Sequence, residues 1–224
     1  MMILSETTIS VLKNFASINP GIIIRNGNTL RTISKLQNLL AKVEITESFD
    51  NTICIYDLNR FLAVVSSLKD PNIIVNDGAK SLKIKSDSSV TNYGLSDESL
   101  IIAPPEKDLN VENAEVNFSL PQATLSQILK LAGVMGLPNV CVRGDRSKIS
   151  IAAIDVKNQD SDVFSIDVGE TQSEFNMIFV TENFKLLSEN YDVAISSKGV
   201  AHFKTANGKI QYWIATEAGS KFVE

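Results

Sequence analysis

The chain has 224 residues, of which 44% are apolar and 21% charged, and its net charge is −5 at pH 7. A chain of this length can form two domains of about 110 residues, each with its own core. The acidic balance excludes a surface that is positive all over, and the apolar runs are far shorter than the ~20 residues that a membrane-spanning helix needs.

The first predicted unit is an amphipathic helix followed by a β-hairpin. Over residues 4–19, apolar residues recur at helical spacing on one face, and polar residues share the other face with Lys13. Asn19-Pro20-Gly21 then stops the helix, and the sequence at residues 26–28 favours a hairpin turn. This order of helix, stop and hairpin repeats along the chain.

The second copy of the unit covers residues 55–82. Asp57 can cap its helix because a carboxylate accepts hydrogen bonds from the first backbone N–H groups. Pro71 ends the helix because proline has no backbone N–H to donate. The polar face includes Arg60, and the hairpin is predicted to turn at residues 76–78, where Asn-Asp-Gly favours a tight turn.

Residues 95–113 differ in composition and predict a linker between two domains. The stretch is polar and acidic, and its Pro104-Pro105 pair favours an extended, solvated backbone. The expected domains are residues 1–108 and 109–224. An apolar island at residues 101–103 has two open interpretations: it packs on its own domain, or it forms part of a peptide-binding groove.

Two further copies follow the linker. The third helix starts at Pro121, where a missing N–H costs nothing, and its polar face carries Lys130. The fourth helix, predicted over residues 182–187, is short and places Lys185 to the side. The pattern therefore predicts an α+β fold of two similar domains, each with two helices packed on antiparallel sheets.

The helix faces that point away from the core share a composition. They are small and polar, with an occasional Lys or Arg and few acids. Side by side they would form a mildly positive surface on an acidic protein. The alternative is that they are solvated faces with ordinary charges.

Catalytic, cofactor and metal motifs are missing from the sequence. It has no glycine-rich phosphate loop and no Cys/His cluster with metal-ligand spacing. The single histidine, His202, is predicted to be a surface or cross-strand residue, and Asp160 and Asp162 lack further ligands nearby. Arg143-Gly144-Asp145 is predicted to be a hairpin turn rather than an adhesion motif. We therefore expect a binding protein that is not an enzyme and needs no cofactor.

The two cysteines, Cys54 and Cys141, lie in apolar, strand-like runs. We interpret them as buried free thiols, with a disulfide in an oxidising compartment as the alternative. The first residues, MMILSETT, lack the basic start and long apolar segment of a secretion signal. Both observations favour an intracellular protein.

Four stretches carry a resemblance to a known family. They are LKNFASINPGIII at residues 12–24, IYDLNRFL at 55–62, SLIIAPP at 99–105 and ENFKLLSENY at 182–191. Over nearly its whole length the chain resembles the sliding clamps of T-even-type bacteriophages, which are DNA polymerase processivity factors.

The resemblance implies a DNA clamp fold and a homotrimeric ring with helices inside and sheets outside. Such a ring encloses double-stranded DNA without sequence preference and tethers the DNA polymerase, and an ATP-driven clamp loader places it. In this family the clamp also contacts the transcription machinery to activate late transcription. The implied location is the cytoplasm of an infected bacterium, with no membrane partner, no cofactor and no catalytic residue.

The resemblance also implies two sets of site residues. The DNA-facing set is Lys13, Arg60, Lys130 and Lys185, and the partner-peptide groove is Ile101, Ile102, Pro104, Pro105, Ala215 and Thr216. Two positions depart from the family pattern: Arg60 stands where the family can have a small residue, and Gly133 where it can have a basic one. A plain solvated charge is the alternative role for each lysine.

Elementary physics agrees with such a role. A tether that slides should avoid contacts with base edges and make only a few phosphate contacts, because many would hold it in place.

Two alternative functions stay open: a β-rich structural or virion protein, and a small-molecule enzyme on a β-rich scaffold. A clamp is expected to be a trimer of roughly 75 kDa, three times the chain mass of 24.5 kDa.

Overall fold

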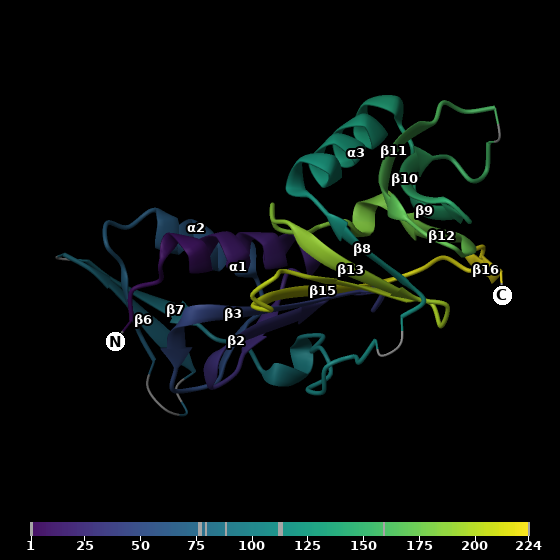
Figure 1. The fold of residues 1–224 in the computed structure, drawn as a ribbon. Helices are drawn as coiled ribbons and strands as arrows, with labels where there is room; N and C mark the ends of the chain where they lie inside the picture. Colours follow the sequence, from purple (N-terminus) through teal and green to yellow (C-terminus); the bar gives the residue numbers. More distant parts are fainter. Residues whose placement is uncertain are drawn as a thin grey trace. The chain divides into compact units, whose positions relative to one another are not determined.

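The structure, a computed structural model, describes residues 2–75, 78, 80–87, 89–111, 114–158 and 160–223. It forms two compact units, Met1–Lys107 (unit 1) and Asp108–Glu224 (unit 2). Each unit combines α-helix with antiparallel sheets (Figure 1), which confirms the predicted α+β class. The predicted turn residues Asn76 and Asp77 lie outside the described residues.

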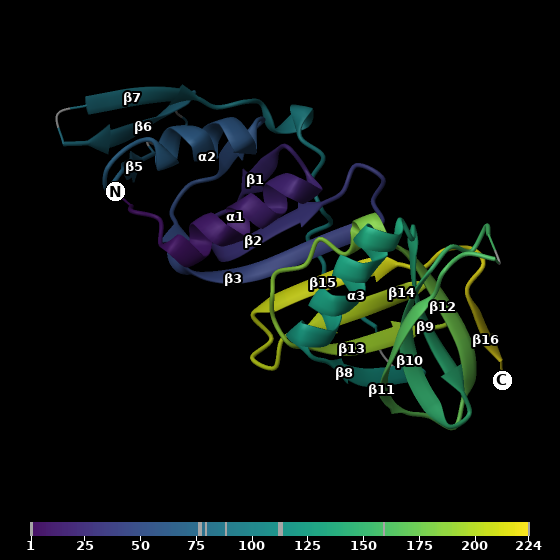
Figure 2. The ribbon, with the colours of Figure 1, turned by 90° about the horizontal axis from the view of Figure 1, so that it is seen from above.

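Unit 1 contains two helices that lie side by side on the strands (Figure 2). Its elements are α1 (Glu6–Ile18), β1 (Ile22–Ile24), β2 (Gly27–Ile33), β3 (Leu39–Phe49), β4 (Ile53–Ile55), α2 (Leu58–Ser66), β5 (Asn72–Ile74), β6 (Ser81–Ser86), β7 (Ser89–Gly94) and the 3-10 turn η1 (Glu98–Leu100). β1 pairs with β4 and β2 with β3, while β5, β6 and β7 form a three-stranded antiparallel sheet. Helix α1 packs on β2 and β3.

The two helices of unit 1 form where their apolar stripes and caps predict. The side chain of Ser5 accepts a hydrogen bond from the backbone N–H of Thr8 at the start of α1. Asp57 does the same for the N–H of Arg60 at the start of α2, which confirms the predicted cap. The apolar residues of both stripes are buried; they are Val11, Leu12 and Phe15 in α1 and Leu58, Phe61, Leu62 and Val65 in α2.

Unit 2 packs one α-helix on a five-stranded sheet (Figure 1). Its elements are β8 (Val116–Leu120), α3 (Gln122–Met135), β9 (Asn139–Asp145), β10 (Lys148–Ile154), β11 (Phe164–Glu170), β12 (Glu174–Val180), the 3-10 turn η2 (Thr181–Asn183), β13 (Tyr191–Ser196), β14 (Val200–Lys204), β15 (Ile210–Ala215) and β16 (Lys221–Val223). The five-stranded sheet has the order β11-β10-β9-β12-β16. Strands β15, β14, β13 and β8 pair in that order, also antiparallel.

Helix α3 begins and ends at the predicted residues. Pro121 is its N-cap, and Gly136 ends it with a φ of 67°, a left-handed conformation that glycine adopts without steric cost. The buried face consists of Leu125, Ile128 and Ala132. At the Arg143-Gly144-Asp145 triplet β9 runs into the hairpin with β10, where the Asp145 carboxylate accepts hydrogen bonds from two backbone N–H groups.

The prediction of a second α-helix in unit 2 is wrong. Residues Thr181–Asn183 form only the 3-10 turn η2, without a side-chain cap, and the chain then continues to β13 without helical structure. Two tyrosine hydroxyls occupy the backbone groups of Leu187: its N–H donates to Tyr212 (3.2 Å), and its carbonyl accepts from Tyr191 (2.7 Å). A six-residue pattern is too short to form a helix unaided, and the bonds to Tyr212, 25 residues away, and to Tyr191, four residues away, hold the segment in its irregular conformation.

Both cysteines are free thiols, as predicted. Cys141 is fully buried, and burial raises the pKa of its thiol. Cys54 is only half-buried, which differs in part from the prediction. No helix among the described residues is long and apolar enough to cross a membrane.

Candidate functional site

The exposed faces of the three described α-helices are nearly free of acids. Their exposed residues are Glu6, Thr7, Ser10, Lys13 and Ser17 in α1, Asn59, Arg60, Ala63 and Ser66 in α2, and Gln122, Ala123, Ser126, Gln127, Lys130, Gly133 and Val134 in α3. Three cations and one carboxylate give these helices a net charge of +2, within a chain whose net charge is −5. The one acid, Glu6, lies in a first turn, where the helix dipole favours negative charge. The predicted segregation of charge is therefore present on these helices.

Lys13 and Lys130 lie on the exposed faces of α1 and α3. Both side chains are flexible point charges, which suits a transient phosphate contact better than base recognition. The exposed neighbours of Lys13 on its helix are Ser10 and Ser17, and those of Lys130 are Ser126, Gln127, Gly133 and Val134, so neither lysine has an acid beside it on its own helix. Both lysines are therefore exposed on helix faces, as their spacing predicted, and their DNA-facing role stays a prediction.

Arg60 has a partner within unit 1. Its guanidinium lies over the ring of Tyr93, 5.9 Å from the centroid, and the Tyr93 hydroxyl donates to the backbone carbonyl of Asp57 (3.0 Å). Burial raises the pKa of Tyr93. Arg60 and Tyr93 also line a pocket of about 300 Å³, together with the exposed ring of Tyr56. Arg60 thus stacks on Tyr93 of β7, a contact that the sequence pattern does not indicate.

Lys185 does not lie on a helix. It is exposed in the irregular segment that follows η2. The helical placement of this residue was therefore wrong, because the helix on which it depended is not formed. Its side chain remains accessible to solvent.

The apolar island of unit 1 is divided between the core and the surface. Ile101 is buried, with 8% of its surface exposed, whereas Ile102 is 42% exposed. Ile101 packs against Gly21, where an added Cβ would lie only 3.3 Å from the Ile101 Cγ2 atom. Pro104 is half-buried and Pro105 exposed. One isoleucine therefore belongs to the core of unit 1, and the other offers an apolar side chain to solvent.

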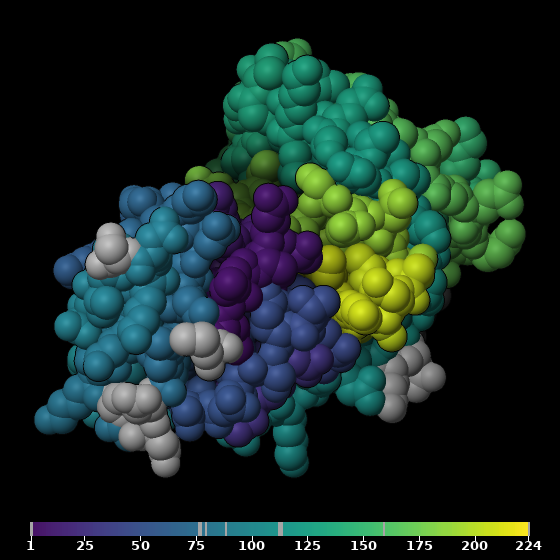
Figure 3. Space-filling model, turned by 90° about the vertical axis from the view of Figure 1, so that its left-hand side faces the viewer, coloured from purple at the N-terminus to yellow at the C-terminus, as the bar shows by residue number. Residues whose placement is uncertain are grey.

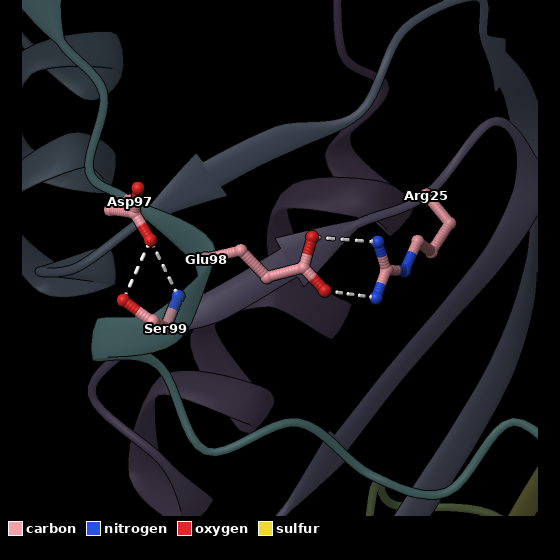
Figure 4. Close-up of polar contacts among 4 residues, drawn as sticks. All are labelled: Arg25, Asp97, Glu98 and Ser99. Carbon is pink, nitrogen blue, oxygen red and sulfur yellow. Dashed lines mark hydrogen bonds and ion pairs between the residues drawn. The ribbon is translucent and has the colours of Figure 1, made fainter.

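An ion pair fixes the start of this segment. The guanidinium of Arg25, between β1 and β2, makes two hydrogen bonds to the carboxylate of Glu98 in η1 (Figure 4). The neighbouring Asp97 accepts from the backbone N–H of Ser99 (2.9 Å) and from its hydroxyl (2.7 Å). These hydrogen bonds lower the pKa of Asp97. The turn that precedes the island is therefore well defined.

The other two predicted groove residues lie in unit 2. Ala215 ends β15 opposite Val200, and both are half-buried. The backbone N–H of Thr216 donates to the carbonyl of Gly199 (3.0 Å). Ala215 and Thr216 therefore lie at the end of β15.

His202 is a cross-strand residue, as predicted. Its ring stacks on that of Trp213, its partner on β15, with 4.6 Å between centroids, and its Nε2 atom lies 3.0 Å from Oε1 of Gln211. Burial lowers the pKa of His202. The described residues contain no group of three or more His, Cys, Asp or Glu side chains placed to hold a metal ion.

Comparison with known proteins gives two family matches that together cover most of the chain. Residues 5–103 match the family model for the DNA polymerase processivity factor, and residues 117–218 match that for the C-terminal part of the gp45 sliding clamp. The chain is 29% identical to the sliding clamp of Vibrio phage KVP40, over 97% of this chain and all of that one. It is 28% identical to the sliding clamp of Enterobacteria phage T4, over 98% of each.

The chain belongs to the sliding clamps of T4-type bacteriophages. The family resemblance drawn from the sequence is therefore confirmed, and with it the role of DNA polymerase processivity factor. A solved structure with the same fold is A. fulgidus PCNA bound to the C-terminal region of FEN-1, with a TM-score of 0.69. At 17% identity, over 95% of this clamp and 96% of that chain, the likeness shows the clamp fold.

The sequence did not predict the contacts of two residues of this clamp, because their partners are remote in sequence. Tyr93 contacts Arg60 from β7, and Asn19 bonds to Ile102 across 83 residues. Asn19 was interpreted only as part of a helix stop. Its side chain could not be placed from the periodicity of its own segment.

Proposed function

We propose that three copies of this clamp form a ring that encloses duplex DNA and tethers the replicative DNA polymerase. The observation that supports this most directly is the segregation of charge, with +2 on the α-helices of a chain that carries −5. Sparse cations on a ring's inner wall would bind phosphates weakly and without base preference. The closed ring would then provide retention, while the clamp itself catalyses no reaction.

The DNA-facing residues in this proposal are led by Lys13 and Lys130. Both are exposed on helix faces that carry few acids. Arg60 and Lys185 are secondary members, because one stacks on Tyr93 and the other lies off the helices. Negative charge elsewhere on the chain would repel DNA from the wrong surface.

Ring closure is proposed to use two free strand edges. Among the described residues, β7 lies at one edge of the three-stranded sheet of unit 1, and β11 at one edge of the five-stranded sheet of unit 2. An edge strand offers unpaired N–H and C=O groups to another chain. Contact between β7 of one copy and β11 of the next would be heterologous, and such contacts form a closed ring when the rotation between copies is about 120° for three subunits. Phe164, Ile166 and Val168 of β11 are half-buried and would be covered in this contact.

The partner-binding surface is proposed to centre on Ile102, with Ile101, Pro104 and Pro105 shaping the segment around it. Exposed Ile102, followed three residues later by exposed Pro105, offers an apolar anchor of the kind that dominates peptide affinity. The PCNA neighbour has a C-terminal region of a partner enzyme bound to it. We extend this mode to the polymerase, and we propose Ala215 and Thr216 as partner-binding residues of unit 2.

Further partners follow from the same role. An ATP-driven clamp loader would open and place the ring, and the transcription machinery would use the clamp as a late-transcription co-activator. The place of action would be the cytoplasm of the infected bacterium. The rival function, a structural or virion protein, would require none of these partners.

Two measurements test the proposal. Light scattering should give a mass of roughly 75 kDa, three times the 24.5 kDa of the chain. The clamp, loaded with its cognate loader onto nicked circular DNA, should stay bound until a restriction enzyme linearises the circle, and should then slide off. Equal retention on circular and linear DNA would refute encirclement, and a shell-sized assembly would favour the structural rival.

A further inference from the structure

Asn19 occupies a buried position where three segments of unit 1 meet. It ends α1, and only 4% of its surface is exposed. Its Nδ2 group donates to the carbonyls of Ile33 (3.0 Å) and Ile102 (3.1 Å), and its Oδ1 atom accepts from the N–H of Gly21 (3.1 Å). One amide therefore joins the end of a helix, the end of β2 and the segment that carries Ile102.

We call residues 97–106 the strap. Besides Asn19, two arginines hold it: Arg25 pairs with Glu98 (Figure 4), and Arg31 donates to the carbonyl of Glu106. All three side chains come from residues 19–31. Since Ile101–Glu106 belongs to no strand or helix, tertiary bonds and the packing of Ile101 define its path.

The bond to Ile102 has a direct geometric consequence. Asn19 binds the backbone carbonyl of Ile102, while 42% of the surface of that residue stays exposed. Because the same NH₂ group also donates to Ile33, the strap is held at a set distance from the end of β2. Because this bond fixes the carbonyl of Ile102, it restricts the backbone conformation of that residue and therefore the direction of its exposed side chain.

We propose that Asn19 is a positioning residue for partner binding, holding Ile102 in its binding orientation before the polymerase arrives. This inference rests on the proposed function, in which the strap contacts the polymerase. A surface ordered in advance loses less conformational entropy when its partner binds. Asn19 is suited to the task because an amide supplies both the two donors and the acceptor that the site uses, whereas a carboxylate has no donor.

The chain offers a matched control in unit 2. Asn139 is also buried, with 7% of its surface exposed, and its amide bridges the carbonyl of Phe179 and the N–H of Val156 (both 3.4 Å). It has no bond to the strap. Asn19→Ser and Asn139→Ser therefore remove comparable buried amides, and only the first releases the strap.

The experiment uses the full-length clamp and the purified DNA polymerase of the same phage. Asn19→Ser should weaken polymerase binding about tenfold, roughly the cost of ordering one backbone residue, and should speed hydrogen exchange at Ile101–Ala103. Asn139→Ser should lower the melting temperature without changing either readout. Normal polymerase affinity in the folded Asn19→Ser clamp would overturn the inference.

Hydrogen exchange in the unaltered clamp and polymerase binding by Ile102→Asp complete the test. If Asn19→Ser does not fold, hydrogen exchange in the unaltered clamp decides: strap amides that become protected only after polymerase binds would overturn the inference. Ile102→Asp separates the two proposals. If it weakens binding while Asn19→Ser does not, only the role of Asn19 is wrong; if neither weakens binding, the partner role of the strap is wrong as well.

Discussion

The hydroxyl of Thr8, in the first turn of α1, donates a hydrogen bond of 2.6 Å to the carboxylate of Glu47 on β3. The same carboxylate accepts from the backbone N–H of Ser5 and from the hydroxyl of Thr46 (2.8 Å). Figure 3 shows this end of unit 1, with the purple N-terminal residues at the surface beside the blue of β3. A strand residue thus supplies the negative charge that the start of α1 favours.

The first prediction concerns this contact. Partial burial alone would raise the pKa of Glu47, but the hydrogen bonds from Thr8, Ser5 and Thr46 outweigh it and lower the pKa to about 2. Because the folded-state pKa lies below the ordinary glutamate value of 4.5, the stabilisation is complete above pH 4.5 and is lost as the pH falls toward 2. Glu47→Gln should lower the free energy of unfolding by about 1 kcal/mol at pH 7, as loss of a helix cap does, and by less at low pH.

Urea unfolding at a series of pH values checks this prediction. Glu44, exposed on the same strand, provides the matched control Glu44→Gln, which should leave stability nearly unchanged. A pH-independent difference between Glu47→Gln and the unaltered clamp would show that the carboxylate charge is not responsible.

The second prediction concerns the helix cations. Lys13→Glu combined with Lys130→Glu should reduce loading and processive synthesis and leave the proposed trimer intact, because in the proposed ring both changes place negative charge opposite phosphates. Each lost phosphate contact should also lower the salt-dependence slope of DNA binding by about 0.9. Primer extension on a long circular template with the cognate loader and polymerase measures the effect. Lys157→Glu, in an exposed loop of unit 2, is the control, and an equal loss from it would remove the special role of the helix faces.

The sequence predicted correctly those elements whose apolar stripe and capping residue lie within the same short segment. The helix of residues 58–66 has its apolar stripe and its cap, Asp57, within a few residues of each other, and it forms as expected. The fourth helix had a stripe but no cap, and the hydroxyls of Tyr191 and Tyr212 bind its backbone instead. Those hydroxyls belong to strands that follow it in the chain, so its own periodicity could not reveal them.

The same distinction applies to the candidate site. The exposure of Lys13 and Lys130 follows from helical spacing, which can be read from the sequence of each helix alone. The burial of Ile101 and exposure of Ile102 depend on Gly21 and Asn19, far earlier in the sequence. Two adjacent isoleucines have equal hydropathy, so only the tertiary contacts distinguish the core residue from the surface residue.

The third prediction concerns Arg60 and Tyr93. A guanidinium over a tyrosine ring at an exposed site is worth about 0.5–1 kcal/mol, so Arg60→Ala should lower the free energy of unfolding by that amount. A double-mutant cycle with Tyr93→Leu isolates the contact, since in the absence of the ring Arg60→Ala should have little effect. Chemical denaturation of the four proteins measures the coupling. Strictly additive losses would mean that the stacking contributes nothing to stability.

The last prediction contrasts the neighbours Ile101 and Ile102. Ile102→Asp should weaken binding of the polymerase and leave the proposed trimer and the melting temperature unchanged, because the Ile102 side chain is already 42% exposed. Ile101→Ala should instead lower the free energy of unfolding by about 2–5 kcal/mol, because it removes a buried side chain that packs on Gly21. Polymerase affinity, light scattering and urea unfolding of both variants separate these effects. If Ile102→Asp dissociates the trimer or destabilises the fold as strongly as Ile101→Ala, the exposed isoleucine is a structural residue and the partner surface lies elsewhere.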